Sequence, residues 1–450
     1  MSEVPPPASA ECVIVLGGGI AGISAAATLQ AAGHKVIVID QQAQIGGTHR
    51  SRQIGPYTFD AGSIFYEETA RIFDLAPALR ESCPEVLSIQ RRIAPDGSIL
   101  LYPIEPRDLL RQPVLRLVLA VLDLIVSRIC LRQDGTLEKL CTKRLGRRFF
   151  DDTGLRHYLT RFHHVPPRQI DEEFFFRRMA IIERFTRTKN LARSALRAVL
   201  PRRPQASARQ WPMRVRPQQG FDALFGPIAR HLSAMGVEFA LSESIVSLAR
   251  EGAFFIVRTD QGTRLASAII STIPLDRLHR ALFSRPSGLE SLDMTTLYVS
   301  AEWLHPDIGN VLFNFHADGA WKRATIYSRI YPDPAIAREF FSVETTLAPG
   351  TQHDPQGAFA AFCAHVESLK LARGLKLEGH ELLEDCYPLL SVGTHKTLDS
   401  VLARIGITGI ITAGRQGSFE YLPTSSGVIA QVARQISGLA AAAPKPEMAA

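Results

Sequence analysis

Residues 13–40 read VIVLGGGIAGISAAATLQAAGHKVIVID, and this stretch decides the fold. Residues 13–16 are a short apolar run, typical of a strand that is buried on both faces. A helix rich in small residues follows it, and Gly33 stands where such a helix ends. Residues 36–39 form a second apolar run. The order of these segments predicts a strand–helix–strand unit of a parallel sheet.

Three glycines follow the first strand with the spacing G-x-G-x-x-G. Gly17 allows the tight turn, Gly19 lets the backbone approach a pyrophosphate, and Gly22 lets the helix pack closely on the strand. A glycine-rich loop that binds nothing is the alternative reading. The complete order of strand, helix, strand and terminal acid counts against it.

The helix begins at Ile20 and Ala21, whose backbone amides and helix dipole would hold phosphate groups. Asp40 closes the second strand. A carboxylate at this position accepts hydrogen bonds from ribose hydroxyls. The stretch therefore predicts a dinucleotide site.

The chain has 450 residues, which favours two domains, and its 46% hydrophobic and 21% charged residues indicate a globular protein. Its first eleven residues, MSEVPPPASAE, are polar, so we expect no signal peptide. The six cysteines form no C-x-x-C pair. We therefore expect no disulfide framework, no metal site and a cytoplasmic location.

The positive charge is concentrated in one segment. The chain carries a net charge of +7, whereas residues 174–217 alone hold twelve Arg and Lys against one acid, Glu183. On a helix, one face would be cationic; its candidates are Arg177, Arg178, Arg184, Arg187, Lys189, Arg193 and Arg197. A solvated face, an anionic substrate and an anionic membrane surface remain open. A fold signature for nucleic acid is missing, so we expect no nucleic-acid partner.

A second unusual segment is QPVLRLVLAVLDLIVSRICLR, residues 112–132. Arg116, Asp123 and Arg128 interrupt its apolar runs, so a membrane-spanning helix is not expected. One interpretation is an amphipathic helix packed in a substrate domain. The other is a surface that touches lipid or a lipid-linked substrate.

The segment after Asp40 narrows the choice of cofactor. DQQAQIGGTHRS places Gly46 and Gly47 shortly before Arg50 and Ser51, and FDAGS follows at 59–63. With the first glycines, this pattern resembles the flavin-binding superfamily of amine oxidases, protoporphyrinogen oxidases and UDP-galactopyranose mutases. The resemblance implies FAD, with Gly46, Gly47 and Arg50 at its phosphates and isoalloxazine edge and Ser51 among the cofactor-binding residues. It also implies non-covalent FAD, because residues 391–450 contain no cysteine.

Two later segments resemble the same superfamily. In the first segment, around residue 245, the strand backbone at Ile245 and Val246 would meet the adenine of FAD. The second is GIITAGRQGSFEYLPTSSGVIAQVARQISGL, residues 409–439, in which Ser425 or Ser426 is the expected N-cap of a helix aimed at the flavin. Its implied cofactor-binding residues are Gly414, Arg415, Ser426, Gly427 and Val428.

The resemblance implies an α/β fold, with a Rossmann-like FAD-binding domain and a discontinuous α+β substrate domain. We expect residues 1–84, 205–285 and 395–441 in the FAD-binding domain, 85–204 and 286–394 in the substrate domain, and 442–450 as a flexible tail.

The substrate domain resembles the mutase and bacterial protoporphyrinogen oxidase-like branch only loosely. The Trp-Gly of that branch is absent, and Phe162-His163-His164 stands near its place. Only Tyr421 of the mutases' tyrosine pair is clear, with Phe419 in the other slot. Candidate catalytic residues are His163, Arg323 and Tyr421.

Three functions follow from the resemblance. The first is an FAD-dependent oxidoreductase that moves a hydride from an organic substrate to flavin N5. The second is a mutase-like flavin-dependent sugar isomerase, and the third is a non-catalytic protein like the escort and dissociation-inhibitor proteins. The substrate is expected to be a small molecule, anionic or lipid-linked. The protein would lie in the cytoplasm, with a peripheral position on the inner face of the membrane as an open alternative.

Overall fold

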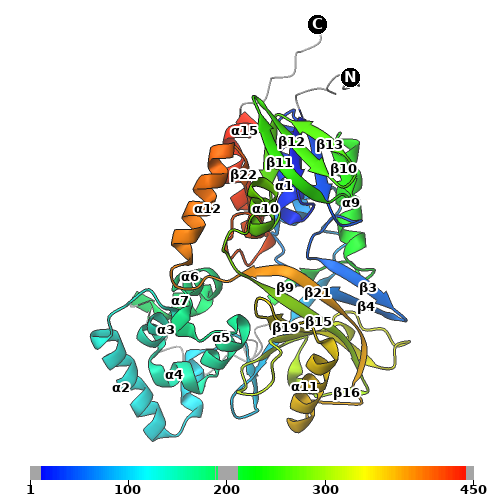
Figure 1. The fold of residues 1–450 in the computed structure, drawn as a ribbon. Coiled ribbons are helices and arrows are strands. Elements are labelled where there is room, and N and C mark those ends of the chain that lie inside the picture. The colour runs from blue at the N-terminus through cyan, green and yellow to red at the C-terminus, as the bar shows by residue number, and fades with distance from the viewer. Residues whose placement is uncertain (1–11, 188, 191–210, 442–450) are drawn as a thin grey trace, which may run out of the picture.

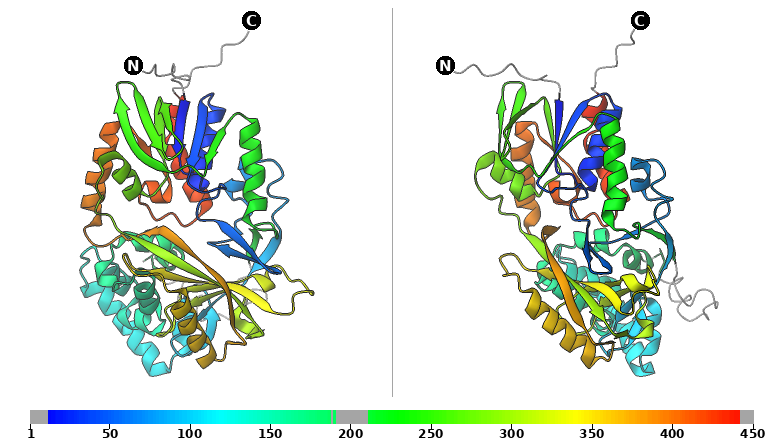
Figure 2. Two further views of the ribbon diagram at one scale, coloured as in Figure 1. Left: turned by 45° about the vertical axis from the view of Figure 1, so that its right-hand side comes forward. Right: turned by 90° about the vertical axis from the view of Figure 1, so that its right-hand side faces the viewer.

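The computed structural model describes residues 12–187, 189–190 and 211–441. Figure 1 shows two stacked layers, with the parallel sheet and its helices above a larger sheet and a group of helices. The two turned views in Figure 2 show the same stacking. Each layer takes strands from distant parts of the sequence.

The upper layer is built on a five-stranded parallel sheet with the order β10-β2-β1-β14-β22. Its strands are β1 (Cys12–Leu16), β2 (Lys35–Asp40), β10 (Glu238–Leu241), β14 (Ala268–Ser271) and β22 (Ile411–Thr412). All five residues of β1 are buried, as expected for a central strand. Helix α1 (Ile20–Ala31) joins β1 to β2, so the predicted strand–helix–strand unit is confirmed.

Further elements cover this sheet. A three-stranded antiparallel sheet consists of β11 (Ile245–Glu251), β12 (Phe254–Thr259) and β13 (Thr263–Ala266). The helices of the upper layer are α9 (Phe221–Ala234), α10 (Leu275–Phe283), α12 (Thr394–Thr408), α13 (Gly414–Gly417), α14 (Ser425–Gln435) and α15 (Ser437–Ala441). Helices α1 and α14 contact each other, which brings the two ends of the chain to one face. The Rossmann-like α/β fold is therefore confirmed.

The lower layer contains a seven-stranded mixed sheet with the order β21-β15-β19-β18-β17-β7-β8. Its strands are β7 (Gln90–Ile93), β8 (Ile99–Leu101), β15 (Ser291–Ala301), β17 (Val311–Asn314), β18 (Arg323–Ile326), β19 (Glu339–Leu347) and β21 (Lys376–Pro388). Helix α11 (Pro355–Ser368) packs on it through an apolar cluster that includes Trp321 and Phe362.

A group of helices lies beside this sheet (Figure 1). It comprises α2 (Val114–Cys130), α3 (Leu137–Leu145), α4 (Arg147–Asp152), α5 (Leu155–His163), α6 (Glu173–Arg178) and α7 (Ala180–Thr186). Met179 interrupts the basic segment between α6 and α7, with φ −106° and ψ 32°. The predicted cationic face on one continuous helix is therefore wrong, and Arg193 and Arg197 lie outside the described residues.

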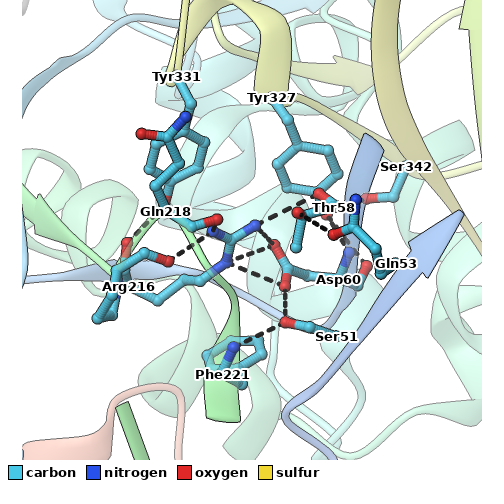
Figure 3. A network of polar contacts seen from close by, with 11 residues as sticks. Ser51, Gln53, Thr58, Asp60, Arg216, Gln218, Phe221, Tyr327, Tyr331 and Ser342 are labelled. Atoms are coloured by element: carbon cyan, nitrogen blue, oxygen red, sulfur yellow. Dashed lines mark hydrogen bonds and ion pairs between the residues drawn. The ribbon is translucent and has the colours of Figure 1, made fainter. Parts of the chain in front are cut away.

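Short strands connect the two layers: β3 (Arg50–Ile54), β4 (Tyr57–Ala61), β5 (Phe65–Tyr66), β6 (Glu85–Ser88) and β9 (Trp211–Val215). A fully buried ion pair fixes them (Figure 3), in which Arg216 Nη2 lies 2.7 Å from Asp60 Oδ2. Tyr327 of the lower layer donates to the Asp60 carbonyl at 3.0 Å, and Tyr331 donates to the Arg216 carbonyl at 2.7 Å. This network holds the β3–β4 hairpin against the larger sheet.

Candidate functional site

A cavity of about 820 Å³ lies between the two layers. It begins at the carboxyl ends of β1 and β2, the usual ligand site of an open parallel sheet. Most of the predicted cofactor-binding residues line it: Gly17, Gly19, Ile20, Ala21, Asp40, Gly46, Gly47, Arg50, Ile245, Val246, Arg415, Ser426 and Val428. The candidate catalytic residues Arg323 and Tyr421 line its other end.

The glycine turn has the geometry of a phosphate cradle. Gly17 has φ +98°, and a Cβ on Gly22 would lie 1.7 Å from the Gly17 carbonyl oxygen. A Cβ on Gly19, by contrast, would meet no atom closer than 3.7 Å, so space is open beside it. Helix α1 has no capping side chain and no acid in its first turn. Its first amides are therefore suited to a pyrophosphate.

Asp40 stands at the edge of this cradle. Its carboxylate accepts hydrogen bonds from the backbone N–H groups of Gly18 at 2.5 Å and Gln42 at 2.7 Å. Burial raises the pKa of Asp40, and these two hydrogen bonds oppose the rise. Two backbone donors thus orient the carboxylate, which has further lone pairs for ribose hydroxyls.

The double glycine closes the cradle from the opposite side. Gly46 and Gly47 have φ +125° and +64°, and a Cβ on Gly47 would lie 3.0 Å from Gly19 Cα. The two loops therefore approach each other through backbone alone. Arg50 lines the cavity, but its guanidinium already donates to the Gly47 carbonyl and to Glu381, both at 3.0 Å.

The strand β11 has unpaired backbone groups at Val246, the position predicted for adenine. The ladder between β11 and β12 shifts register between Ile245 and Ser247, which leaves Val246 without a partner on β12. Val246 is exposed and lines the cavity. Its backbone groups are thus available to the edge of a base.

The start of α14 also faces the cavity through Ser425 and Ser426. Its N-cap is Thr424, whose hydroxyl accepts the N–H of Gly427 at 3.1 Å. The predicted N-cap at Ser425 or Ser426 is therefore one or two residues too late. Pro423 precedes Thr424, and Ser425 is already the first helical residue.

Four predicted cofactor residues do not line the cavity: Gly22, Ser51, Gly414 and Gly427. The Ser51 hydroxyl donates to Asp60 and accepts the N–H of Phe221 at 2.7 Å, so it belongs to the buried network in Figure 3. A Cβ on Gly414 would lie 2.5 Å from Ala21 Cβ. The three glycines serve close packing or helix capping, and Ser51 serves the interlayer network.

His163 is also absent from the cavity lining. It is buried on α5, its Nδ1 lies 2.9 Å from the Leu159 carbonyl oxygen, and its ring packs against Phe162 and Phe174. Burial lowers the pKa of His163 to about 4, so it is neutral at pH 7. The structure therefore places His163 in the helical core and contradicts a catalytic role.

Aromatic rings form the walls at the other end of the cavity. Tyr102 stacks on Phe313 with 3.7 Å between ring centroids, and Tyr387 is nearly parallel to Tyr421, at 6.1 Å and 15°. Phe419, which the sequence placed beside Tyr421, does not line the cavity. Tyr387 takes that place, because β21 ends there and presents its ring to Tyr421.

A buried charge cluster supports these rings. Glu344 accepts a hydrogen bond from Arg323, and its Oε2 lies 3.1 Å from Lys322 Nζ. Burial alone would raise the pKa of Glu344, but Arg323 and Lys322 outweigh it and lower the pKa to about 2. Lys322 also donates to the Tyr387 hydroxyl at 3.0 Å. The Nε of Arg323 is buried and has no hydrogen-bond partner among the described residues.

Two further guanidinium groups, Arg178 and Arg415, line the same end. Within the described part of the chain, no hydrogen bond or ion pair joins either guanidinium to another residue. Arg415 lies over the Tyr387 ring at 5.3 Å, and Arg178 lies among tyrosine side chains. With one carboxylate shared by Lys322 and Arg323, this end carries an excess of positive charge.

The sequence analysis did not single out Arg178 as a site residue; it counted Arg178 among the residues of a cationic face and left a solvated face, an anionic substrate and a membrane surface open. A signal was present: Arg178 follows the buried Phe174 and Phe175 by four and three residues on α6. Residues at these spacings share a helix face. His49 was missed as well; it lines the cavity, and burial together with Arg415 lowers its pKa to about 4.

A separate group of half-buried side chains has metal-ligand composition. Asp171, Glu173 and His395 bring their ligand atoms within 4.8 Å of one another. His395 Nε2 lies 3.2 Å from Glu173 Oε2 and 3.5 Å from Asp171 Oδ1. The imidazole and the two carboxylates contact one another directly, and the absence of a resident metal stays a prediction.

Comparison with known proteins agrees with the observed fold. The sequence model of an NAD(P)-binding Rossmann-like domain matches residues 15–78. No curated protein sequence matches the chain. Among solved structures, reduced UDP-galactopyranose mutase is similar, with a TM-score of 0.76 and 17% identity over 97% of this chain and 96% of the mutase.

Two other solved structures show the same arrangement. A protein from Exiguobacterium sp. 255-15, provisionally named a protoporphyrinogen oxidase, has a TM-score of 0.73 and 18% identity over 96% of this chain and 99% of its own. Cyclohexylamine oxidase from Brevibacterium oxydans IH-35A has a TM-score of 0.61 and 14% identity over 96% and 99%. The chain thus shares, over nearly its whole length, the fold of these three solved structures.

Proposed function

We propose that this protein is an FAD-dependent oxidoreductase that takes a hydride from a small anionic organic substrate. The observation that carries the proposal is a single cavity with two ends. One end has the glycine cradle, Asp40 and the free strand backbone at Val246. The other has aromatic walls and the unpaired guanidinium groups of Arg178 and Arg415.

The residues at the first end fit FAD. The α1 amides would hold its pyrophosphate, Asp40 its adenosine ribose, and the Val246 backbone its adenine. The flavin supplies the capacity to accept a hydride from an organic substrate. The start of α14 would place its positive end beside the cofactor.

The protein would then contribute binding and orientation. Arg178, Arg415 and the unpaired Nε of Arg323 would bind an anionic group of the substrate. The parallel rings of Tyr387 and Tyr421 would hold the organic part. His49 is neutral at pH 7 and so adds no charge to the site.

The experiment is an anaerobic titration of the purified yellow protein with amines, porphyrinogens, sugar nucleotides and other anionic compounds. Bleaching of the oxidised flavin absorbance by one class would support the proposal and name the substrate class. A colourless protein that takes up no added FAD would contradict it, and would favour the non-catalytic alternative.

The FAD is proposed to be non-covalent. Cys386 is the cysteine that lines the cavity, and burial raises the pKa of its thiol, which keeps it protonated and a poor nucleophile. Acid precipitation should therefore leave the yellow colour in the supernatant. Colour retained in the pellet would contradict this prediction.

A mutase-like isomerase is the second candidate, favoured by the tyrosine pair beside Arg415 and by the likeness to UDP-galactopyranose mutase. An isomerase would convert a sugar nucleotide only after the flavin is reduced with dithionite, with no net flavin oxidation. An oxidoreductase would consume oxidised flavin in proportion to substrate.

A further inference from the structure

Helix α2 is amphipathic in the reverse of the usual sense. Its apolar side chains point to solvent: Val114, Leu115, Val118, Val121, Leu122, Ile125, Val126 and Ile129 are between 43% and 78% exposed. They repeat at spacings of three and four residues, so they form one continuous face about 25 Å long. Figure 1 shows α2 at the outer edge of the helical group.

The side of α2 that is turned toward the protein carries small and polar side chains together with the half-buried Leu117 and Leu124. Its buried residues are Ala120 and Ser127. Asp123 accepts the N–H of Arg148 at 2.9 Å, and Arg128 donates to the carbonyl oxygens of Arg144 and Thr186 at 3.0 and 2.6 Å. These bonds fix which face of the helix is turned outward. Helix α2 is thus an amphipathic helix that packs on α3 and α4, as the first sequence interpretation has it, but its apolar face is turned outward.

An exposed apolar face of this length marks an interaction surface. The chain segment that contains α2 is basic: residues 101–190 hold 18 Lys and Arg against 11 Asp and Glu. Exposed Arg111 and Arg132 flank the two ends of α2, and exposed Arg147 and Arg148 lie on the adjoining α4. The acid of α2, Asp123, is already bonded to the start of α4.

We propose that α2 lies flat in the surface of an anionic lipid bilayer. The apolar face would enter the boundary between headgroups and acyl chains, and the surrounding arginines would bind anionic headgroups. A second copy of the chain is a poorer occupant, because the contact would bring two cationic borders together. No helix in the described ranges is both long enough and apolar enough to cross a bilayer.

The proposal does not depend on the oxidoreductase activity. Two connections join α2 to the cavity. Tyr102, which lines the cavity, lies shortly before α2 in the chain. Arg128 of α2 donates to the end of α7, and α7 directly follows the segment that carries the cavity-lining Arg178. A protein held in this way would keep the substrate end of its cavity close to the membrane. That position suits a membrane-derived anionic substrate.

The experiment is co-sedimentation of the full chain with vesicles of phosphatidylcholine that contain phosphatidylserine as the minor, anionic lipid, at low and at high NaCl concentration. The test variant is the triple change Leu115→Gln, Leu122→Gln and Ile129→Gln, on the exposed face. The control is Leu87→Gln, Val392→Gln and Ile407→Gln, which are also exposed apolar residues but lie far from α2 in sequence. Circular dichroism and flavin absorbance check that each variant is folded.

Wild type and control should bind the vesicles, and high salt or pure phosphatidylcholine should weaken binding. The α2 variant should lose about tenfold or more in partitioning. Equal binding by all three proteins would overturn the proposal, as would no binding by wild type at low salt. A concentration-dependent dimer of wild type that the α2 variant lacks, without vesicle binding, would assign the face to a second copy.

Discussion

The two ends of the cavity are built in different ways. The end proposed to bind FAD, the nucleotide end, uses mainly backbone: four glycines (Gly17, Gly19, Gly46 and Gly47), the start of α1 and the carboxylate of Asp40. The substrate end uses long side chains from distant segments, such as Tyr102, Arg178 and Tyr387. A backbone cradle depends on local spacing, whereas a side-chain pocket depends on long-range packing. Substitutions at the two ends should therefore affect different properties of the protein.

The largest effect is expected at the nucleotide end, for Gly22→Val. Its Cβ would lie 1.7 Å from the Gly17 carbonyl oxygen, and neither backbone can move without separating α1 from β1. Overpacking typically costs about 1–3 kcal/mol and occasionally more, and a clash with backbone on both sides belongs at the upper end. We expect little folded protein and no bound FAD, as measured by thermal melting and absorbance.

The control for this substitution is Gly406→Ala, on α12, where an added Cβ meets no neighbour within 4 Å. It should be neutral or slightly stabilising. A Gly22→Val protein that melts like wild type with FAD bound would show that the cradle is not rigid.

The next effect concerns the support of the substrate end, with Glu344→Gln. It leaves Lys322 and Arg323 buried without their carboxylate, which costs about 3–5 kcal/mol. Glu339→Gln, on the same strand, should cost less than about 1 kcal/mol because Glu339 is half-buried. Thermal unfolding would measure both. Equal losses would contradict the assignment of Glu344 as the buried counterion.

The same carboxyl predicts an acid-dependent loss of stability. Its pKa is about 2 in the folded protein, below the ordinary value of 4.5. The folded state therefore gains stability from the charged form above about pH 4.5, and loses that gain as the pH falls from 4.5 toward 2. The Glu344→Gln variant should lack this component of the pH dependence.

At the nucleotide end, Asp40→Ala removes the ribose acceptor. Charge-assisted hydrogen bonds of about 1.5–3 kcal/mol would be lost, so the dissociation constant of FAD should rise by about ten- to a hundredfold while the fold survives. The control is Glu238→Ala, an exposed acid on the neighbouring β10. An unchanged FAD affinity in Asp40→Ala would show that the carboxylate does not bind the ribose.

The smallest effect is expected for Arg178→Gln, because Arg323 and Arg415 would still face the substrate anion. The KM of the substrate found by flavin bleaching should rise by about tenfold, with FAD affinity unchanged. Arg177→Gln is the matched control, since Arg177 is exposed and already paired with Glu173 at 2.9 Å. Equal effects of the two substitutions would remove Arg178 from the substrate site.

The sequence alone determined the nucleotide half. Gly17, Gly19, Gly22 and Asp40 could be interpreted because backbone sterics and strand spacing act within a single strand–helix–strand unit. The same holds for the strand pattern of the parallel sheet, whose apolar runs are short and continuous. Thr424 was missed as the N-cap only because its neighbours Ser425 and Ser426 are equally good capping residues.

Only the tertiary structure decided the substrate half. Arg178 points inward because Phe174 and Phe175 anchor α6 in the core, and Ser51 bonds to Asp60 because the remote Arg216 fixes the carboxylate. Helix α2 turns its apolar face outward because Asp123 and Arg128 bond to distant backbone groups. Such orientations follow from contacts between remote segments, and among these three cases only Arg178 has a local sign of its orientation, its helical spacing from Phe174 and Phe175.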